Sequence, residues 1–316
     1  MAVFHPDLQP SSDRGHLLTE QSNRRSSRLD QLDTLALVEL FADEDRRPQE
    51  AVAAVAPALA QAVDSVAERL RAGGRLFYLG AGTSGRLGVL DAAECPPTFC
   101  SDPKQVQGVL AGGSAALLRS SEGLEDIAAA GRADLEERGF CAKDCLVGIA
   151  AGGTTPYVRG GLAFAKSIGA LAIAMACVPT EQAPLPCEID IRLLTGPELL
   201  TGSTRMKAGT ATKLALNTLS TAVMVKLGKV YGNRMVDVAA SNSKLVDRSL
   251  RILRDLAGVE RERGLTLLEE TGGSVKLALL MAAAALSVDQ AKALLQQHNQ
   301  QLRPALAACG AQLAEA

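Results

Sequence analysis

The architecture of this chain follows from one stretch, Arg75-Leu76-Phe77-Tyr78-Leu79-Gly80-Ala81-Gly82-Thr83-Ser84-Gly85-Arg86-Leu87-Gly88. The run up to Leu79 is short, bulky and almost wholly apolar, which is typical of a strand covered on both faces in a parallel sheet. Closely spaced glycines then allow a tight turn, and a helix can begin at Ser84. The stretch therefore predicts a strand, a turn and a helix, which together form the repeating unit of an α/β fold.

More strands of the same kind are predicted further along the chain. Three short apolar runs are separated by lengths that suit helices: Val106–Ala111, Cys145–Ala150 and Ala170–Ala176. The segment Ile189–Leu193 instead alternates apolar and polar residues, as a half-exposed edge strand does. Five strands with helices between them predict an α/β fold with a doubly wound, parallel, five-stranded sheet.

Helical sequence surrounds this sheet. The alanine-rich run Ala51–Leu70 predicts one long helix that ends at Gly73-Gly74, and Ser203–Val230 predicts another after the last strand. Shorter charged helices are predicted in four segments: Leu245–Leu256, Glu260–Glu270, Ser274–Leu286 and Val288–Gln297. We therefore expect an N-terminal arm with helices over residues 1–60, a sheet domain over 61–230 and a small helical module over 240–316.

Composition narrows the classes of function. The chain has 316 residues, of which 47% are hydrophobic, and its net charge is −2, so it has no overall positive field to attract nucleic acid or an anionic membrane. No apolar run reaches the roughly 20 residues of a membrane span, and the polar start of the chain does not resemble a secretion signal. Seven cysteines at spacings foreign to zinc sites, with only three histidines, predict reduced thiols in the cytoplasm and no metal site.

Loops at the carboxyl ends of the predicted strands are expected to bind the ligand, as in other doubly wound sheets. They are Gly80–Gly85, Ala111–Ser114 and Ala151–Thr155, all rich in Gly, Ser or Thr. The first matches a dinucleotide fingerprint, but no acidic residue ends the second strand to hold a ribose. Its hydroxyls at Thr83 and Ser84, with N–H groups at the helix start, suit a single phosphate group. The alternative is a tight turn with a serine N-cap.

Two glutamates follow these loops. Glu94 precedes Pro96-Pro97, a pair expected to end the first helix after Ala93, and Glu125 belongs to the acidic cluster Glu122–Asp126. Either carboxylate alone could be a solvated charge at a helix end. Two carboxyl groups beside one anion site instead suit general acid–base chemistry, which needs a proton donor and a proton acceptor.

Several blocks of sequence carry a family resemblance. The stretch Leu79–Gly88, with Asp91-Ala92-Ala93-Glu94-Cys95-Pro96-Pro97-Thr98, resembles the N-acetylmuramic acid 6-phosphate etherases. A second block joins Gly196-Pro197-Glu198 to Thr201-Gly202-Ser203-Thr204-Arg205-Met206-Lys207-Ala208-Gly209-Thr210-Ala211-Thr212-Lys213, a signature shared with glucokinase regulatory protein. Shorter matches occur at Thr19-Glu20, Asp43-Glu44-Asp45 and Gly232–Val238.

The resemblance implies a sugar isomerase (SIS) fold, a cytoplasmic homodimer and no cofactor. The implied activity is hydrolysis of the lactyl ether of N-acetylmuramic acid 6-phosphate to N-acetylglucosamine 6-phosphate and D-lactate, in recycling or catabolism of cell-wall amino sugar. The two catalytic glutamates of the family correspond to Glu94 and Glu125. Substrate-binding residues are expected at Gly82, Thr83, Ser84, Gly152, Gly153, Thr155, Glu198 and Ser203.

One departure from the family pattern concerns the phosphate loop. Family members usually have Ser-Gly-Arg-Thr where this chain has Gly152-Gly153-Thr154-Thr155, so a hydroxyl and a guanidinium are missing. Backbone N–H groups at the two glycines remain available to a phosphate. The departure therefore concerns the affinity for substrate more than the chemistry.

An elimination followed by addition of water fits the two glutamates. In the open-chain sugar the C2 proton is acidic because it lies next to the C1 aldehyde, and the lactyl oxygen leaves from C3. We expect Glu125 to remove this proton and Glu94 to protonate the leaving oxygen. This division of roles requires neither a metal nor a nicotinamide cofactor.

Other interpretations remain open at this stage. Three basic residues lie early in the long helix predicted after the last strand: Arg205, Lys207 and Lys213. They line the site, bind the edge of a partner subunit, or are ordinary surface charge. Glu198 either neutralises one of them or touches substrate. A non-catalytic sugar-phosphate-binding regulator of the glucokinase regulatory protein type shares the second signature, although that protein carries a duplicated domain. An aldose–ketose isomerase on the same fold would need a base but no acid for a leaving group.

Overall fold

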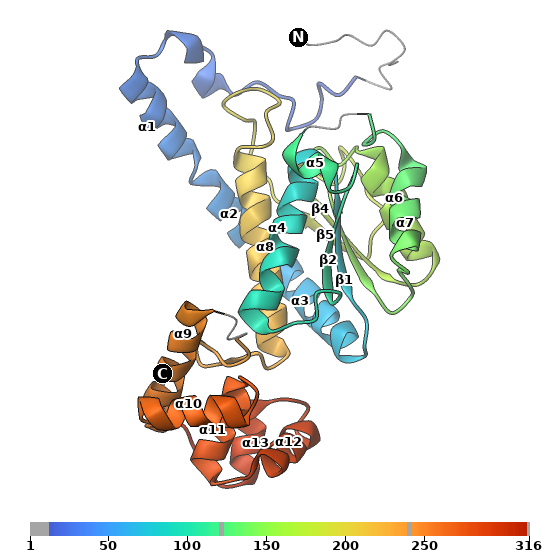
Figure 1. Cartoon of the computed structure of the whole chain (residues 1–316). Helices are drawn as coiled ribbons and strands as arrows, with labels where there is room; N and C mark the ends of the chain where they lie inside the picture. The colour runs from blue at the N-terminus through green and yellow to red at the C-terminus, as the bar shows by residue number, and fades with distance from the viewer. Residues whose placement is uncertain (1–12, 120–122, 239–241, 315–316) are drawn as a thin grey trace.

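Five parallel strands form the central sheet, in the order β2-β1-β3-β4-β5 (Figure 1). The computed structural model describes residues 13–119, 123–238 and 242–314. The strands are β1 (Leu76–Gly80), β2 (Val106–Leu110), β3 (Cys145–Ile149), β4 (Leu171–Ala176) and β5 (Ile189–Arg192). All five predicted strands are present to within one residue at each end, so the prediction of a parallel five-stranded sheet is confirmed.

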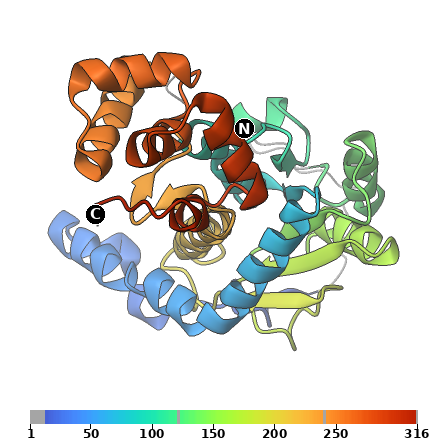
Figure 2. The ribbon, with the colours of Figure 1, turned by 90° about the horizontal axis from the view of Figure 1, so that it is seen from below.

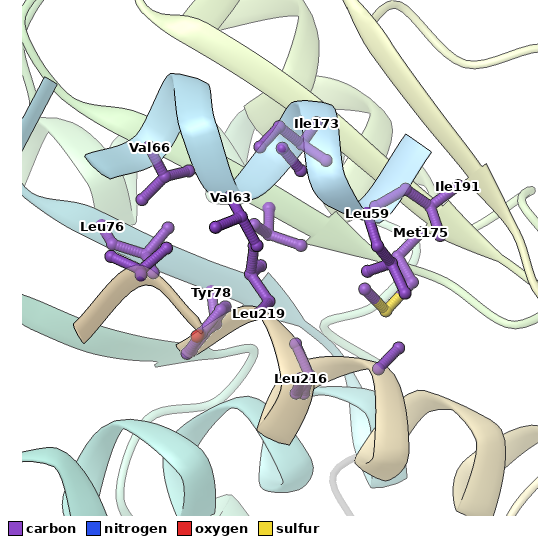
Figure 3. Close-up of a cluster of buried hydrophobic side chains, with 14 of the residues drawn as sticks. Leu59, Val63, Val66, Leu76, Tyr78, Ile173, Met175, Ile191, Leu216 and Leu219 are labelled. Carbon is purple, nitrogen blue, oxygen red and sulfur yellow. The ribbon is translucent and has the colours of Figure 1, made fainter. Parts of the chain in front are cut away.

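Helices cover both faces of the sheet, as predicted for a doubly wound fold. On one face, α3 (Ala56–Arg71), α4 (Gly82–Phe99) and α8 (Lys207–Lys226) pack on Leu76 and Tyr78 of β1. Figure 3 shows how side chains of α3 and α8 meet those of the strands in this core. On the other face, α6 (Ala128–Glu137) and α7 (Pro156–Ser167) pack against the intervening residues of β1, Phe77 and Leu79. Alternate side chains of one buried strand thus supply two cores.

The N-terminal helices differ from the prediction of one helix over Ala51–Leu70. The structure has α1 (Thr34–Glu44), α2 (Arg47–Ala54) and then α3, with a break at Val55. Pro57 lies in the first turn of α3, where its missing N–H is tolerated but cannot continue the preceding helix. Two short 3-10 turns, Arg24–Ser26 and Leu29–Gln31, precede α1. The predicted loose arm falls mostly on residues outside the described part of the chain.

The helix α4 corrects the expectation that Pro96-Pro97 ends it. Both prolines lie within α4, which continues to Phe99. Two consecutive prolines remove two N–H donors but keep a φ compatible with a helix, so the last turn survives. The N–H of Cys100 donates to the Pro96 carbonyl at 2.9 Å, and Cys100 ends the helix in the left-handed conformation at a φ of 49°.

The C-terminal part has a hydrophobic core of its own, built from residues between Tyr231 and Leu313. The hairpin of β6 (Val230–Tyr231) and β7 (Arg234–Met235) leads into it. Five helices follow: α9 (Ser243–Ala257), α10 (Arg261–Glu270), α11 (Val275–Ala284), α12 (Val288–Gln297) and α13 (Leu302–Ala308). Four of them were predicted; the hairpin and α13 were not. Figure 2 shows these helices beside the end of α8, where the Gln301 amide donates to the Lys226 carbonyl at 3.1 Å.

The described helices were compared with the length and hydropathy that a membrane span requires. None of them alone is both long and apolar enough to cross a membrane. Two helix pairs reach that length and composition only when joined, and they are bent by 57° and 106° at the junction.

Candidate functional site

A cavity of about 170 Å³ lies at the carboxyl ends of β1 and β3. Two of the three predicted loops line it, through Gly82, Thr83 and Ser84 on one side and Gly152 and Thr155 on the other. The third predicted loop, Ala111–Ser114, is not part of its wall. The sheet therefore brings two phosphate-type loops together at one point, as its parallel topology predicts. We call this cavity the anion pocket.

Three helices begin at the anion pocket. Gly82 opens α4, Thr155 is the N-cap of α7, and Ala208 and Gly209 belong to the first turn of α8. The first N–H groups of a helix have no partner within that helix, and the helix dipole places partial positive charge there. Among the residues that line the pocket in the described part of the chain, none is basic. The pocket therefore attracts an anion through backbone dipoles and hydroxyl groups.

The glycines of the first loop are required by close backbone contact. A Cβ on Gly85 would lie 2.4 Å from the Gly80 carbonyl oxygen, and a Cβ on Gly80 would lie 2.6 Å from the Gly85 nitrogen. The end of β1 thus touches the start of α4 directly. The alternative of a serine-capped turn is wrong, because Ala81 is the N-cap of α4 and no side chain caps the helix. The hydroxyl of Ser84 therefore has no capping role.

Glu125 also lines the anion pocket. It is half-buried on the turn that precedes α6, and its backbone carbonyl accepts a hydrogen bond from the Tyr157 N–H at 3.0 Å. The α6 and α7 backbones lie close together, since a Cβ on Gly160 would lie 2.0 Å from the Ala128 carbonyl oxygen. The α7 helix that presents Thr155 therefore also fixes the backbone of Glu125. Glu122, from the same predicted acidic cluster, lies outside the described residues.

Glu94 lies elsewhere in the subunit. Ten residues of α4 separate Ser84 from Glu94, which corresponds to about 15 Å along the helix axis. Glu94 is exposed and lines a second hollow, of about 140 Å³, between α4 and α8. Lys213 and Asn217 of α8 line the same hollow. We call it the α4–α8 hollow. Within one chain the two predicted catalytic glutamates thus line different cavities.

A buried polar cluster lies beneath the α4–α8 hollow. The carboxylate of Asp91 accepts hydrogen bonds from the Tyr78 hydroxyl at 2.9 Å and from the Ser220 hydroxyl at 3.1 Å. Burial raises the pKa of Asp91, although both hydrogen bonds act in the opposite direction. Asp91 precedes Glu94 by three residues and therefore lies on the same side of α4. Asp91 was not predicted as a site residue, although it belongs to the block Asp91–Thr98 that carries the family resemblance.

Glu198 has a structural role that the sequence did not indicate. Its two carboxylate oxygens accept hydrogen bonds from the backbone N–H groups of Lys207, at 3.1 Å, and Ala208, at 2.9 Å. Glu198 is fully buried, and burial raises its pKa. A carboxylate at this position satisfies the first N–H groups of α8. This cap explains why α8 begins at Lys207 rather than at the predicted Ser203.

Other residues predicted to bind substrate lie outside the anion pocket. Glu198, Ser203 and Gly153 are not part of its wall, whereas Thr204 is. Gly153 has a φ of +70°, and a Cβ there would lie 2.8 Å from the Cβ of Ala183. A substrate contact of these three residues stays a prediction.

The three basic residues at the start of α8 have separate environments. Lys207 is buried and pairs with Glu44 at 2.5 Å, while Arg205 is exposed and Lys213 faces the α4–α8 hollow. Glu44 also pairs with Arg25, and these groups border a hollow of about 860 Å³. Lys207 therefore joins α1 to α8 and does not reach the anion pocket.

Comparison with known proteins finds a matching family model and several similar relatives. Residues 58–166 match the family model of the glucokinase regulatory protein N-terminal SIS domain. The chain is 94% identical, over the whole of both chains, to an N-acetylmuramic acid 6-phosphate etherase of Synechococcus sp. (strain CC9605). It is 62% identical to one from Nostoc punctiforme (strain ATCC 29133 / PCC 73102), over 93% of this chain and 96% of the other. A phosphoheptose isomerase from Neisseria gonorrhoeae matches 60% of this chain and 96% of its own, with 19% identity and a TM-score of 0.44.

Proposed function

The chain belongs to the N-acetylmuramic acid 6-phosphate etherase family, and from this premise we propose that it releases D-lactate from N-acetylmuramic acid 6-phosphate. The second product is N-acetylglucosamine 6-phosphate. The observation that carries the proposal is the anion pocket, where the starts of three helices meet and which Glu125 also lines. A cytoplasmic role in recycling or catabolism of cell-wall amino sugar follows from this activity.

The anion pocket is suited to the phosphate group of the substrate. Its volume of about 170 Å³ is small beside the roughly 300–1,000 Å³ of a pocket for a whole organic ligand. Hydroxyl groups of Thr83, Ser84 and Thr155 and the first N–H groups of α4 would surround the phosphate oxygens. The sugar then extends out of the pocket past Glu125.

We assign the base of an elimination to Glu125, because it lines the anion pocket. It takes the proton from C2 of the open-chain sugar, the electron pair forms the C2=C3 double bond, and the bond from C3 to the lactyl oxygen breaks. Glu94 gives a proton to the departing oxygen, so lactate leaves as an alcohol. Water then adds to C3 of the unsaturated aldehyde, and a proton returns to C2. Each positioned proton transfer contributes about 10²- to 10⁴-fold to the rate.

A second copy of the chain is needed to unite the two glutamates. The exposed face of α4 and α8 carries Leu90, which is 50% exposed, beside Glu94. Homodimers pair the same surface on both subunits. An antiparallel pairing of α4 with its copy, centred midway between Leu87 and Leu90, would set Glu94 of the partner subunit level with Thr83. The proposed enzyme is therefore a homodimer with sites shared between subunits.

The activity is tested by incubating the protein with N-acetylmuramic acid 6-phosphate in water labelled with heavy oxygen. We expect lactate release, with the label at the C3 hydroxyl of the sugar and none in lactate. Label in lactate would contradict the elimination. Binding of the sugar phosphate without lactate release would indicate a regulator, and an isomerised sugar without lactate would indicate an isomerase.

The shared site is tested with Glu94→Gln and Glu125→Gln. Each variant alone should lose at least about 100-fold in kcat. Co-expression with two different affinity tags allows the heterodimer of the two variants to be isolated. This heterodimer contains one intact site and one doubly altered site, so it should recover roughly half of the wild-type activity. A heterodimer as inactive as its parents would place both glutamates in one chain, and near-wild-type single variants would refute their roles.

A further inference from the structure

We propose that Lys213, on the wall of the α4–α8 hollow, binds the carboxylate of the lactyl group and so selects substrate over product. The inference rests on the proposed etherase activity and adds a residue to its site. Lys213 and Asn217 lie one turn apart on α8 and line the hollow opposite Leu90 and Glu94 of α4. A cation, an amide, a predicted proton donor and the hydrogen-bonded carboxyl of Asp91 thus line one small space.

The charge of Lys213 is available to a ligand. The lysines at the two ends of α8 are paired, Lys207 with Glu44 and Lys226 with Asp64. Lys213 is exposed, and no carboxylate of the described residues lies within 4.0 Å of its ammonium group. Asp91 lines the same hollow and attracts the charge of Lys213, but both of its oxygens are hydrogen-bonded to other side chains.

The lactyl group brings a negative charge into the proposed site. In this group the ether oxygen and the carboxylate are attached to the same carbon, so an acid that protonates the oxygen lies next to a negative charge. Such a charge is costly to bury in the hollow unless a cation pairs with it. Lys213, in the same hollow as Glu94, is placed to neutralise it. The volume of about 140 Å³ suits a three-carbon acid and is too small for the sugar.

Binding through Lys213 affects affinity more than the chemical step. The carboxylate keeps its charge throughout the elimination, so the ion pair is present in both the ground state and the transition state. An interaction of this kind lowers KM and leaves kcat nearly unchanged. It also distinguishes the substrate, which carries the lactyl group, from the sugar product, which does not.

The test compares Lys213→Met with Lys226→Met, a substitution on the same helix at an exposed ion pair. For Lys213→Met we expect KM for N-acetylmuramic acid 6-phosphate to rise about 10- to 100-fold, since a hydrogen-bonded charge is lost. The kcat value and the inhibition constant of N-acetylglucosamine 6-phosphate should change less than about 3-fold, and inhibition by D-lactate should weaken. Lys213→Arg should restore most of the affinity, and Lys226→Met should resemble the wild type.

An unchanged KM in Lys213→Met would overturn the inference. An equal rise in KM and in the inhibition constant of the sugar phosphate product would overturn it too, because Lys213 would then act on the phosphate or on the fold. The wild-type protein separates these results from a failure of the proposed function. If the wild-type protein releases no lactate, the proposed activity is wrong. If the wild type releases lactate and Lys213→Met has the same KM, the activity is correct and only the role of Lys213 is wrong.

Discussion

The two ends of α4 present charge to a ligand in different ways. At its start, the anion pocket has N–H groups, hydroxyls and helix dipoles and no basic side chain among its described lining residues. Three turns later, the α4–α8 hollow has Lys213 beside Glu94 and a buried carboxyl, Asp91, below. A phosphate group can thus be bound by backbone geometry, whereas the proposed carboxylate site depends on one side chain. The first site should be sensitive to backbone shape and the second to charge.

The largest effect is expected where backbone shape is disturbed, at Gly85→Ala. The added Cβ would lie 2.4 Å from the Gly80 carbonyl oxygen and 2.5 Å from Cδ1 of Leu110, so the end of β1 and the start of α4 must separate. A shift of about 1 Å in such a site lowers kcat/KM by roughly 100-fold. Steady-state kinetics with the intact substrate measures this loss.

Gly123→Ala is the matched control, because no atom lies within 4 Å of a Cβ at that position. Wild-type kcat/KM in both variants would show that the anion pocket tolerates a displaced backbone. That result would remove the contrast between the two ends of α4.

The sequence predicts those features of the fold and of the anion pocket that depend on residues close together in the chain. Short apolar runs predict buried strands, and the glycines at 80 and 85 predict the close turn that the structure contains. The cap of α8 by Glu198 was missed because it links residues nine positions apart through a loop. The break at Val55 was missed because alanine-rich sequence outweighed Pro57 in the prediction.

The distance between Glu94 and the anion pocket could have been predicted from the sequence. A helix from Ser84 to Ala93 already places Glu94 at the far end, since each residue advances the chain by about 1.5 Å. The prolines at 96 and 97 were interpreted as setting the direction in which Glu94 leaves the helix. Its distance from the anion pocket depends instead on the number of helical turns before it. What the sequence of one chain lacks is the surface of a second copy, and that surface determines whether the two glutamates meet.

An intermediate effect is expected for Ser84→Ala in the anion pocket. Loss of one hydroxyl donor to a phosphate should raise KM about 10-fold. The inhibition constant of N-acetylglucosamine 6-phosphate should rise by the same factor, because substrate and product share the phosphate. Lys213→Met is expected to affect the substrate alone, so the two variants separate the two ends of α4.

Ser114→Ala serves as the control for Ser84→Ala. Ser114 is exposed and belongs to the predicted loop that does not line the pocket. A change in substrate KM for Ser84→Ala without a change for the product would mean that Ser84 contacts the sugar or lactyl part. The phosphate would then bind elsewhere.

The smallest effect concerns stability at the charged end of α4, through Asp91→Asn. Tyr78 and Ser220 donate to different oxygens of Asp91, and the amide nitrogen that replaces one of these oxygens cannot accept a hydrogen bond. The variant should therefore unfold more easily, by about 1 kcal/mol in acid. Burial raises the pKa of Asp91 above its ordinary value of 3.8, so between these two values the folded wild type binds more protons than the unfolded chain. The contribution of Asp91 to the stability of the wild type is therefore fully present below pH 3.8. It is lost as the pH rises through the raised pKa of Asp91.

The difference in unfolding free energy between Asp91→Asn and the wild type should therefore shrink as the pH rises from 3.8 through the raised pKa of Asp91. The reason is that asparagine does not titrate, so only the wild-type stability changes. Denaturant unfolding from pH 3 to pH 7 measures the difference, and kcat at neutral pH should remain close to the wild-type value. A difference in unfolding free energy that stays constant with pH would mean that the pKa of Asp91 is the same in the folded and unfolded chain. Burial would then not penalise the negative charge of Asp91, and its two hydrogen bonds would offset the loss of water completely.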